Sequence, residues 1–194
     1  MRSATGILLA AGQGQRFGSN KLLHPLANGV PLAVHAARTL QAVLPDTLVV
    51  VNAADQETIK LFENEGLQIV LNDQARRGMG TSIACGVRAS VRSERWVIAL
   101  ADMPCISEET IRSVAAGIHY GNSICAPRYE NQRGHPVGFG KAYADELIGL
   151  MTDEGARHII AANRQHLVLV DTQDRGVIAD IDHLHDLVTA NAYV

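Results

Sequence analysis

The sequence predicts an α/β fold built around a largely parallel sheet. Short apolar runs of strand length alternate with segments of helical periodicity, and this alternation is the signature of that class. No repeat, low-complexity tract or linker interrupts it. A chain of 194 residues with 47% hydrophobic and 19% charged residues is ordinary for one globular unit. Residues 1–194 are therefore expected to form a single domain.

The first part of the chain alternates strands and helices. The opening apolar run has the character of a buried strand, and the next strand is rich in valine. Between them, alanine, leucine and valine recur at helical spacing behind Pro31, which suits a first turn. Gly66 marks the end of the following helix. These signals predict strands over residues 5–11, 47–52 and 67–71 and helices over residues 31–44 and 56–65.

The middle of the chain continues the pattern. Ser107 can cap a helix with Glu108 and Glu109 in its first turn and with Ile111 and Val114 facing inward. Strands joined by such helices form a parallel sheet covered on both faces, and these sheets bind ligands at the carboxyl ends of their strands. The elements predicted here are a helix over residues 81–92, a strand over 96–101, the helix that Ser107 caps and a short strand over 123–126.

The alternation breaks after residue 126. A polar stretch comes first, and the apolar run behind it falls out of sequence with the earlier strands. The remaining segments again show helical or strand character. The predictions for this part are a loop over residues 128–134, a strand over 135–139, helices over 141–151 and 153–163, a strand over 167–171 and a final helix over 182–193.

Composition excludes several classes of function. A net charge of −3 provides no electrostatic basis for binding nucleic acid or an anionic membrane, and 4% aromatic residues are too few for a base-stacking surface. No apolar run approaches the ~20 residues that span a bilayer. Cys85, Cys105 and Cys125 form no C-x-x-C pair, and an odd number of scattered cysteines suits a reducing compartment. A cytoplasmic protein without nucleic-acid or membrane partners is expected.

The first strand leads into a loop that combines glycines with cations. Residues 12–21 read G-Q-G-Q-R-F-G-S-N-K, with Arg16 and Lys21 as the cations. Glycine lets the backbone turn tightly beside a ligand, and the cations can neutralise phosphates. Phe17 stands where a dinucleotide G-x-G-x-x-G motif or a Walker loop would need glycine. The loop therefore predicts a nucleoside triphosphate that is held in another way.

A second motif, L-A-D-M-P at residues 100–104, ends the fourth strand. It is expected at the same sheet edge as the glycine loop. A carboxylate there can hold Mg²⁺ against substrate phosphates, because Mg²⁺ typically takes one or two protein carboxylates and leaves its other positions to phosphate and water. Asp102 is therefore predicted to be a metal ligand and Mg²⁺ to be the cofactor. The alternative is that Asp102 caps the next helix or turn.

These two motifs together resemble those of the MobA-like nucleotidyltransferase family, and more narrowly its molybdenum cofactor cytidylyltransferases. The resemblance covers nearly the whole chain, because five further segments match in the family's order. They are K-L-L with the following P-L at 21–26, G-M-G-T-S at 78–82, R-G-H-P-V at 133–137, D-E-G-A-R at 153–157 and D-I-D at 180–182. The last segment departs from the family pattern, because His183 and Leu184 replace its threonine and proline; Asp182 can still cap the helix behind it.

The resemblance implies a Rossmann-like, three-layer α/β/α fold whose mostly parallel sheet includes one antiparallel strand. It also implies transfer of CMP from CTP to the phosphate of molybdopterin, with release of pyrophosphate. A phosphate dianion needs no general base, so such a site must align the reactants and neutralise charge. Arg16 would hold the β- and γ-phosphates, Lys21 would stabilise charge at the α-phosphate, and Asp102, with Asp182, would hold Mg²⁺.

The resemblance also indicates which residues contact the nucleotide. Members that use GTP commonly carry L-A-G-G where this chain has L-A-A-G, so Ala11 favours CTP; its methyl group would take space that a purine needs. Ser82 could instead be only a helix cap. The nucleotide-binding residues predicted are Leu9, Ala10, Ala11, Gly12, Gln13, Gly14, Asn72, Asp73, Gly78 and Ser82.

The second substrate is expected against residues 133–137 and 153–157. Arg133 and Arg157 would hold the molybdopterin phosphate, and His135, beside Gly134, would donate to the pterin. The alternative for His135 is a structural histidine that fixes the loop before Pro136. Arg76 and Arg77 have the character of a solvated turn, and contact with a phosphate is the alternative.

Three other functions remain open from the sequence. They are a GTP-using molybdopterin guanylyltransferase, a sugar-phosphate nucleotidyltransferase, and a non-catalytic chaperone that hands the pterin cofactor to a client molybdoenzyme. The R-G-H-P-V and D-E-G-A-R segments argue against the sugar-phosphate enzyme. The set of Arg16, Lys21 and Asp102 favours catalysis over a chaperone role.

Overall fold

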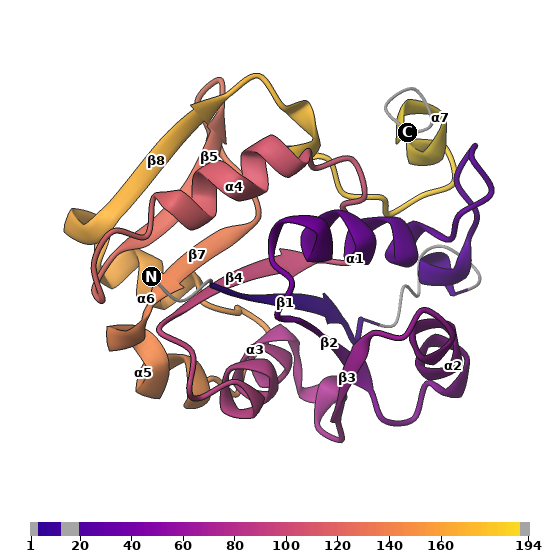
Figure 1. Cartoon of the computed structure of the whole chain (residues 1–194), viewed down its shortest axis with the longest axis horizontal. Helices are drawn as coiled ribbons and strands as arrows, with labels where there is room; N and C mark the ends of the chain where they lie inside the picture. Colours follow the sequence, from indigo (N-terminus) through magenta and orange to yellow (C-terminus); the bar gives the residue numbers. More distant parts are fainter. Residues whose placement is uncertain (1–3, 13–19, 191–194) are drawn as a thin grey trace.

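A computed structural model describes residues 4–12 and 20–190 of the chain (Figure 1). The predicted site residues Gln13, Gly14 and Arg16 lie outside these ranges. The described residues form an eight-stranded sheet in the order β3-β2-β1-β4-β7-β5-β6, with β8 also paired to β5. The strands are β1 (Thr5–Ala10), β2 (Thr47–Asn52), β3 (Gln68–Asn72), β4 (Arg95–Leu100), β5 (Ile124–Tyr129), β6 (Gln132–Arg133), β7 (Val137–Gly140) and β8 (Leu167–Thr172).

The sheet is mostly parallel, with β7 as the inserted antiparallel strand. β1 pairs in parallel with β2 and β4, β2 with β3, and β5 with β8. β7 runs antiparallel to both β4 and β5, and the two-residue β6 is antiparallel to β5. The strand that fell out of sequence order in the chain is thus the one that reverses direction, which confirms the mixed sheet.

Helices cover both faces of the sheet, because the strand side chains alternate between two cores. In β1, Leu8 and Ala10 face the core under α1 (Leu32–Val43), α2 (Gln56–Asn64) and α4 (Glu108–Ala116). Ile7 and Leu9 face the core under α3 (Met79–Ala89), α5 (Ala144–Ile148) and α6 (Arg157–Ala162). Figure 1 shows α1 and α4 on one side of the strands and α3 and α5 on the other. The three-layer α/β/α prediction is confirmed.

Several boundaries in the second half differ from the predictions. Residues 128–134 are not a loop: β5 continues to Tyr129 and turns at Glu130, whose φ is 52°, into β6. A 3-10 turn, Lys141–Tyr143, precedes the short α5. Gly155, with φ of 58°, keeps residues 153–156 in a turn, so α6 begins only at Arg157.

The last helix, α7 (Asp186–Ala190), begins four residues later than predicted. Its start is set by Asp186, whose Oδ2 accepts hydrogen bonds from the backbone N–H groups of Asp182 (3.0 Å) and His183 (2.7 Å). The prediction that Asp182 caps this helix is wrong, because the helix begins four residues after Asp182. The Asp182 side chain is turned to a different partner, Lys21.

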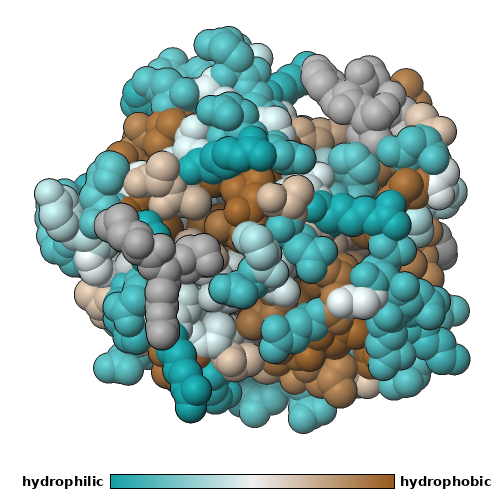
Figure 2. All heavy atoms as spheres, viewed as in Figure 1, coloured by the Kyte–Doolittle hydropathy of each residue, from teal (hydrophilic) through white to brown (hydrophobic). Residues whose placement is uncertain are grey.

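The face of the molecule shown in Figure 2 is predominantly hydrophilic, with hydrophobic residues in smaller areas between polar ones. Among the helices of the described ranges, none is long and apolar enough to cross a membrane. Cys85, Cys105 and Cys125 are all in the thiol form. Burial raises the pKa of Cys105 and of Cys125 to about 11, so both are protonated at neutral pH and pack as small side chains.

Candidate active site

Two adjoining cavities open at the carboxyl ends of the central strands. The first, of about 420 Å³, lies between β1, β4 and the start of α3; the second, of about 560 Å³, extends towards β6, β7 and α6. Both volumes suit small-molecule ligands. The residues that line both cavities are Leu9, Met79, Leu100, Asp102 and Asp153. Asp102 therefore stands at the junction of two ligand-sized spaces.

The first cavity gathers most of the described residues that were predicted to contact the nucleotide. Leu9, Ala10, Ala11, Gly12, Gly78 and Ser82 line it, together with Lys21 and Asp102. Asn72 lies buried behind the wall, and Asp73 is exposed and does not line the cavity. Arg76 and Arg77 are exposed, as the solvated turn predicts, and they also line this cavity. The wall thus carries two cations beyond those singled out in the sequence.

Lys21 is held in place by the residue before it. Asn20 caps the 3-10 turn Lys21–Leu23, because its Oδ1 accepts from the Leu22 N–H at 3.2 Å. The Asn20 amide also donates to Asp55 (3.1 Å) and to Thr58 (2.9 Å) at the start of α2. These bonds fix the end of the glycine loop to a helix, so the backbone of Lys21 has a defined position beside β1.

The Lys21 amine is surrounded by three oxygen atoms. Its Nζ donates to Asp102 Oδ2, Asp182 Oδ1 and the Ile181 carbonyl, each at 2.9 Å. Burial would lower the pKa of Lys21, but the two carboxylates outweigh it and raise the pKa, so the amine is charged. An ammonium group has three N–H donors, and all three are used here. Lys21 therefore contacts the two predicted metal ligands and has no donor left for an α-phosphate in this structure.

The donor set around Lys21 suits a hard divalent cation. Two carboxylates and one carbonyl are the ligand types that Mg²⁺ takes. Among the described residues no group of three or more His, Cys, Asp or Glu side chains could hold a metal, so any ion here would rely on two carboxylates, the Ile181 carbonyl and its substrate. The alternative that Asp102 caps α4 is wrong, because Ser107 does so: its Oγ accepts from Thr110 N–H.

The start of α3 joins the two cavities. Asn72 donates to the Thr81 and Ser82 hydroxyls, each at 3.0 Å, and Ser82 is the fourth residue of the helix, so it is not the cap. Loop 151–156 caps the helix instead. Gly80 N–H donates to the Thr152 carbonyl at 2.8 Å, and Met79 N–H to Asp153 Oδ1 at 3.3 Å. The walls of both cavities are therefore tied together at this point.

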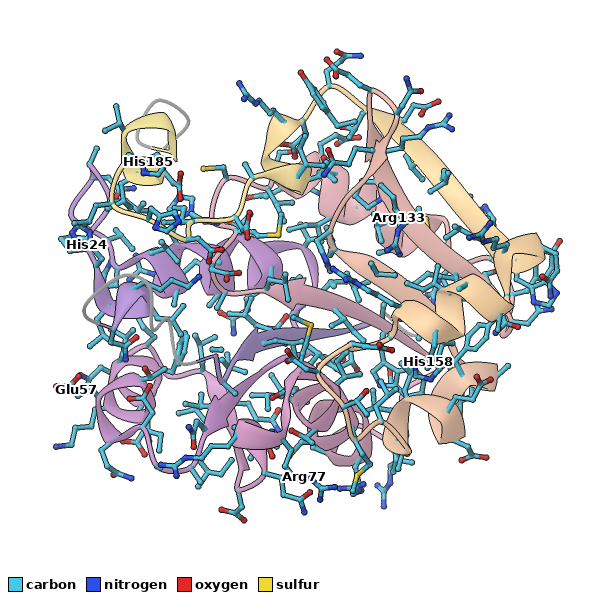
Figure 3. All side chains as sticks on the ribbon, turned by 180° about the vertical axis from the view of Figure 1, so that it is seen from behind. His24, Glu57, Arg77, Arg133, His158 and His185 are labelled. Atoms are coloured by element: carbon cyan, nitrogen blue, oxygen red, sulfur yellow. The ribbon has the colours of Figure 1, made fainter. Side chains whose placement is uncertain are left out.

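The second cavity contains all four residues predicted for the second substrate: Arg133, Gly134, His135 and Arg157. Its other walls combine apolar residues such as Ile83, Val137 and Phe139 with four carboxylates, which belong to Asp102, Asp153, Glu154 and Asp180. Figure 3 places Arg77 near the start of α3 and Arg133 away from it in β6, so the cleft has cations at both ends. This space suits a ligand that has polar as well as apolar parts and an anionic group.

His135 is neutral and lacks a partner for one ring nitrogen. Its Nδ1 is buried and makes no hydrogen bond within the described residues. Burial, reinforced by the Arg133 and Arg157 charges against an opposing effect of Asp102, lowers the pKa of His135 to about 4. Burial and Arg157 likewise lower the pKa of Arg133. A structural histidine would use Nδ1 to hold the loop, and no such hydrogen bond is present among the described residues.

The lowered pKa of His135 predicts a dependence of stability on pH. As pH falls below 6.5, the unfolded chain takes up a proton at His135 before the folded one does. The contribution of the neutral His135 to the free energy of unfolding is therefore fully present above about pH 6.5. It is lost as pH falls towards 4, and the loss is about 2 to 3 kcal/mol in all. Urea unfolding at pH 7 and at pH 4.5 measures this loss. Between these pH values the free energy of unfolding should fall by about that amount more for the unmodified protein than for the His135→Asn variant. Equal losses would mean that the imidazole is not desolvated.

A three-layer fold with adjoining ligand cavities, a lysine and two carboxylates at the carboxyl edge of its sheet has the architecture of a nucleotidyltransferase. Residues 6–168 match the MobA-like NTP transferase domain, and the chain belongs to that family. Its relatives are named for different activities, so the family match alone does not determine the substrates.

Three similar proteins illustrate this range. A nicotine blue oxidoreductase of Paenarthrobacter nicotinovorans is 30% identical over 94% of each chain. A probable molybdenum cofactor guanylyltransferase of Thermococcus sibiricus is 29% identical over 75% of this chain and 71% of its own. A solved nucleotidyl transferase from Methanothermobacter superposes with a TM-score of 0.84 at 20% identity, over 99% of this chain and 97% of that one. The fold and the enzyme class agree with the predictions.

Two contributors to the site had no individual role assigned to them from the sequence. The Ile181 carbonyl completes the oxygen set around Lys21, and no side-chain pattern could indicate a backbone atom. Asp153 lines both cavities and binds the start of α3. Its signal was present in the D-E-G-A-R segment, of which only the arginine was assigned a role.

Proposed function

We propose that the protein transfers CMP from CTP to the phosphate of molybdopterin, releasing pyrophosphate and forming molybdopterin cytosine dinucleotide. The observation that carries the proposal is the position of Asp102 in the walls of both cavities. CTP would occupy the first cavity and molybdopterin the second. Their phosphates would then meet at Asp102, where the substrate phosphate oxygen attacks the α-phosphorus and the bond to the β-phosphate oxygen breaks.

The residues divide this task between neutralising charge and positioning the acceptor. Asp102 and Asp182 would hold Mg²⁺, which when bound neutralises charge on the attacking and leaving phosphates. Arg133 and Arg157 would hold the phosphate of the acceptor, and the neutral His135 would lie beside its ring system. Nothing in this scheme needs a general base, because the attacking phosphate is mostly dianionic at pH 7. Arg16 keeps the role at the β- and γ-phosphates that the sequence predicts.

The choice of CTP rests on Ala11. It is buried and lines the first cavity, so its methyl group narrows the space available to a base. One methyl group in such a wall changes specificity by about 10- to 200-fold. Pyrophosphate release with Mg²⁺ and molybdopterin is therefore expected to be at least about ten-fold more efficient, as kcat/KM, with CTP than with GTP. A preference for GTP would overturn this part of the proposal.

Two variants and an acceptor screen sharpen the test. Ala11→Gly should shift the CTP-to-GTP ratio of kcat/KM towards GTP by about ten-fold. Ala75→Gly removes a methyl group from the same cavity wall and should leave the ratio unchanged. The acceptors are molybdenum-bound molybdopterin, metal-free molybdopterin and sugar phosphates. Pyrophosphate release with sugar phosphates alone would reassign the substrate. If none of these acceptors supports pyrophosphate release, the chaperone role would be favoured.

A further inference from the structure

We propose that Lys21 occupies the divalent-cation site of the nucleotide-free protein and must leave it before a metal ion can bind. This inference rests on the proposed function, because it takes Asp102 and Asp182 as the metal ligands. It adds that the free protein protects its own site with an internal cation. Lys21 then competes with the metal ion in the free protein and contacts phosphate once the nucleotide is bound.

The geometry around Nζ supports this exchange. Three oxygens converge on one cation at equal distances of 2.9 Å. The Lys21 side chain is only 9% exposed, compared with 26% for Asp102 and 40% for Asp182. The ammonium therefore fills the inner side of the oxygen set, where a metal ion contacting all three atoms would have to stand.

Charge makes the two occupants mutually exclusive. The two carboxylates carry a charge of −2, and Lys21 reduces it to −1. A divalent ion would neutralise the carboxylates alone, and an ammonium group in contact with it would then repel it with no anion left between them. Lys21 must move outward when the ion enters.

The surroundings provide a place for the displaced amine. Lys21 itself lines the first cavity, so its side chain needs only to rotate towards the space assigned to the triphosphate. Its backbone stays in place, because Asn20 is bonded to Asp55 and Thr58. Phosphates in that cavity would accept the freed N–H donors. Nucleotide and metal therefore favour each other's binding, and the metal binds weakly to the nucleotide-free protein.

Manganese binding to the nucleotide-free protein tests the exchange without any turnover. Mn²⁺ is titrated by electron paramagnetic resonance into the protein and into Lys21→Met, which keeps the length of the side chain but not its charge. Lys21→Met should bind Mn²⁺ at least about ten-fold more tightly. Lys141→Met removes a surface lysine paired with Glu94 and should change the affinity less than about two-fold. Unchanged or weaker binding by Lys21→Met would overturn the proposal.

Two additions keep the result interpretable if Lys21→Met does not fold. Lys21→Gln is neutral but retains hydrogen-bond donors, and it should also bind Mn²⁺ more tightly. In the unmodified protein, an amine-reactive label read by mass spectrometry compares the three lysines, Lys21, Lys60 and Lys141. Adding Mn²⁺ should raise labelling of Lys21 about three-fold or more relative to the exposed Lys60. Constant or reduced labelling would contradict displacement.

A double variant separates failure of the exchange from failure of the proposed function. If Asp102→Asn abolishes Mn²⁺ binding in the Lys21→Met background, the metal lies at Asp102. If it does so while Lys21→Met alone binds no more tightly than the unmodified protein, the metal site stands and only the exchange is overturned. If the double variant binds as tightly as Lys21→Met, the ion lies elsewhere and both proposals fail.

Discussion

Replacing Asp102 with asparagine (Asp102→Asn) is expected to lower kcat by about a thousand-fold or more while leaving the fold intact. The carboxylate lies in the walls of both cavities and is bound to Lys21 at 2.9 Å. Asparagine has nearly the same shape, so packing is preserved, but it lacks the charge needed to hold a divalent cation between two phosphates. Pyrophosphate release at saturating CTP and acceptor measures the effect.

The control for this variant is another aspartate in an ion pair. Asp171 on β8 pairs with Arg128 and is largely exposed, away from the cleft. Asp171→Asn should leave kcat unchanged within about two-fold, because an exposed pair contributes little. Circular dichroism and urea unfolding should show both variants folded. A near-normal rate for Asp102→Asn would remove Asp102 from the reaction.

Replacing Gly78 with alanine should both destabilise the protein and impair the reaction. Gly78 has φ of 119°, and an added Cβ would lie 2.5 Å from Asp153 Cα and 2.6 Å from Asp153 N. Left-handed backbone and overpacking each cost about 1 to 3 kcal/mol, so a loss of about 3 kcal/mol in the free energy of unfolding is expected. The chain can relieve the contact only by separating loop 151–156 from α3. Because Gly78 and Asp153 line the cleft, kcat/KM should fall about ten-fold or more.

Gly66 offers a matched control for the backbone conformation alone. Its φ is 68°, and nothing lies within 4 Å of an added Cβ. Gly66→Ala should therefore lower the free energy of unfolding by only about 1 kcal/mol. Its kcat/KM should stay unchanged, since Gly66 follows α2 in the chain and lines neither cavity. Urea unfolding and pyrophosphate release compare the two variants. Equal effects on both measurements would show that the contact with Asp153 does not matter.

The order of strands and helices in the first half could be predicted because it is locally encoded. Valine-rich strands, the Ser107 cap and the stop at Gly66 act over a few residues, and the observed β2, α2 and α4 follow them closely. The second half was harder. The hairpin of β5 and β6 forms from polar residues that have no strand pattern, because β5 is held by β8 on its other side.

In the candidate site, too, some features are encoded locally in the sequence and others depend on contacts between remote segments. Its residue types and their location at one sheet edge could be predicted, since carboxyl ends of parallel strands meet there. Which charges contact each other could not. Lys21 meets Asp102 across 81 residues of chain and Asp182 across 161, and its third partner is a backbone carbonyl.

The periodicity of the sequence predicted the α/β fold, and the resemblance of its motifs to those of a family predicted a nucleotidyltransferase with Asp102 at its site, because periodicity and motif spacing are properties of short stretches of chain. The tertiary structure decided that Lys21 is paired with both predicted metal ligands, that His135 is neutral with an unpaired Nδ1, and that Asp153 joins the two cavities. These properties depend on burial and on distances between remote segments. They arise only when packing removes water and brings those segments together.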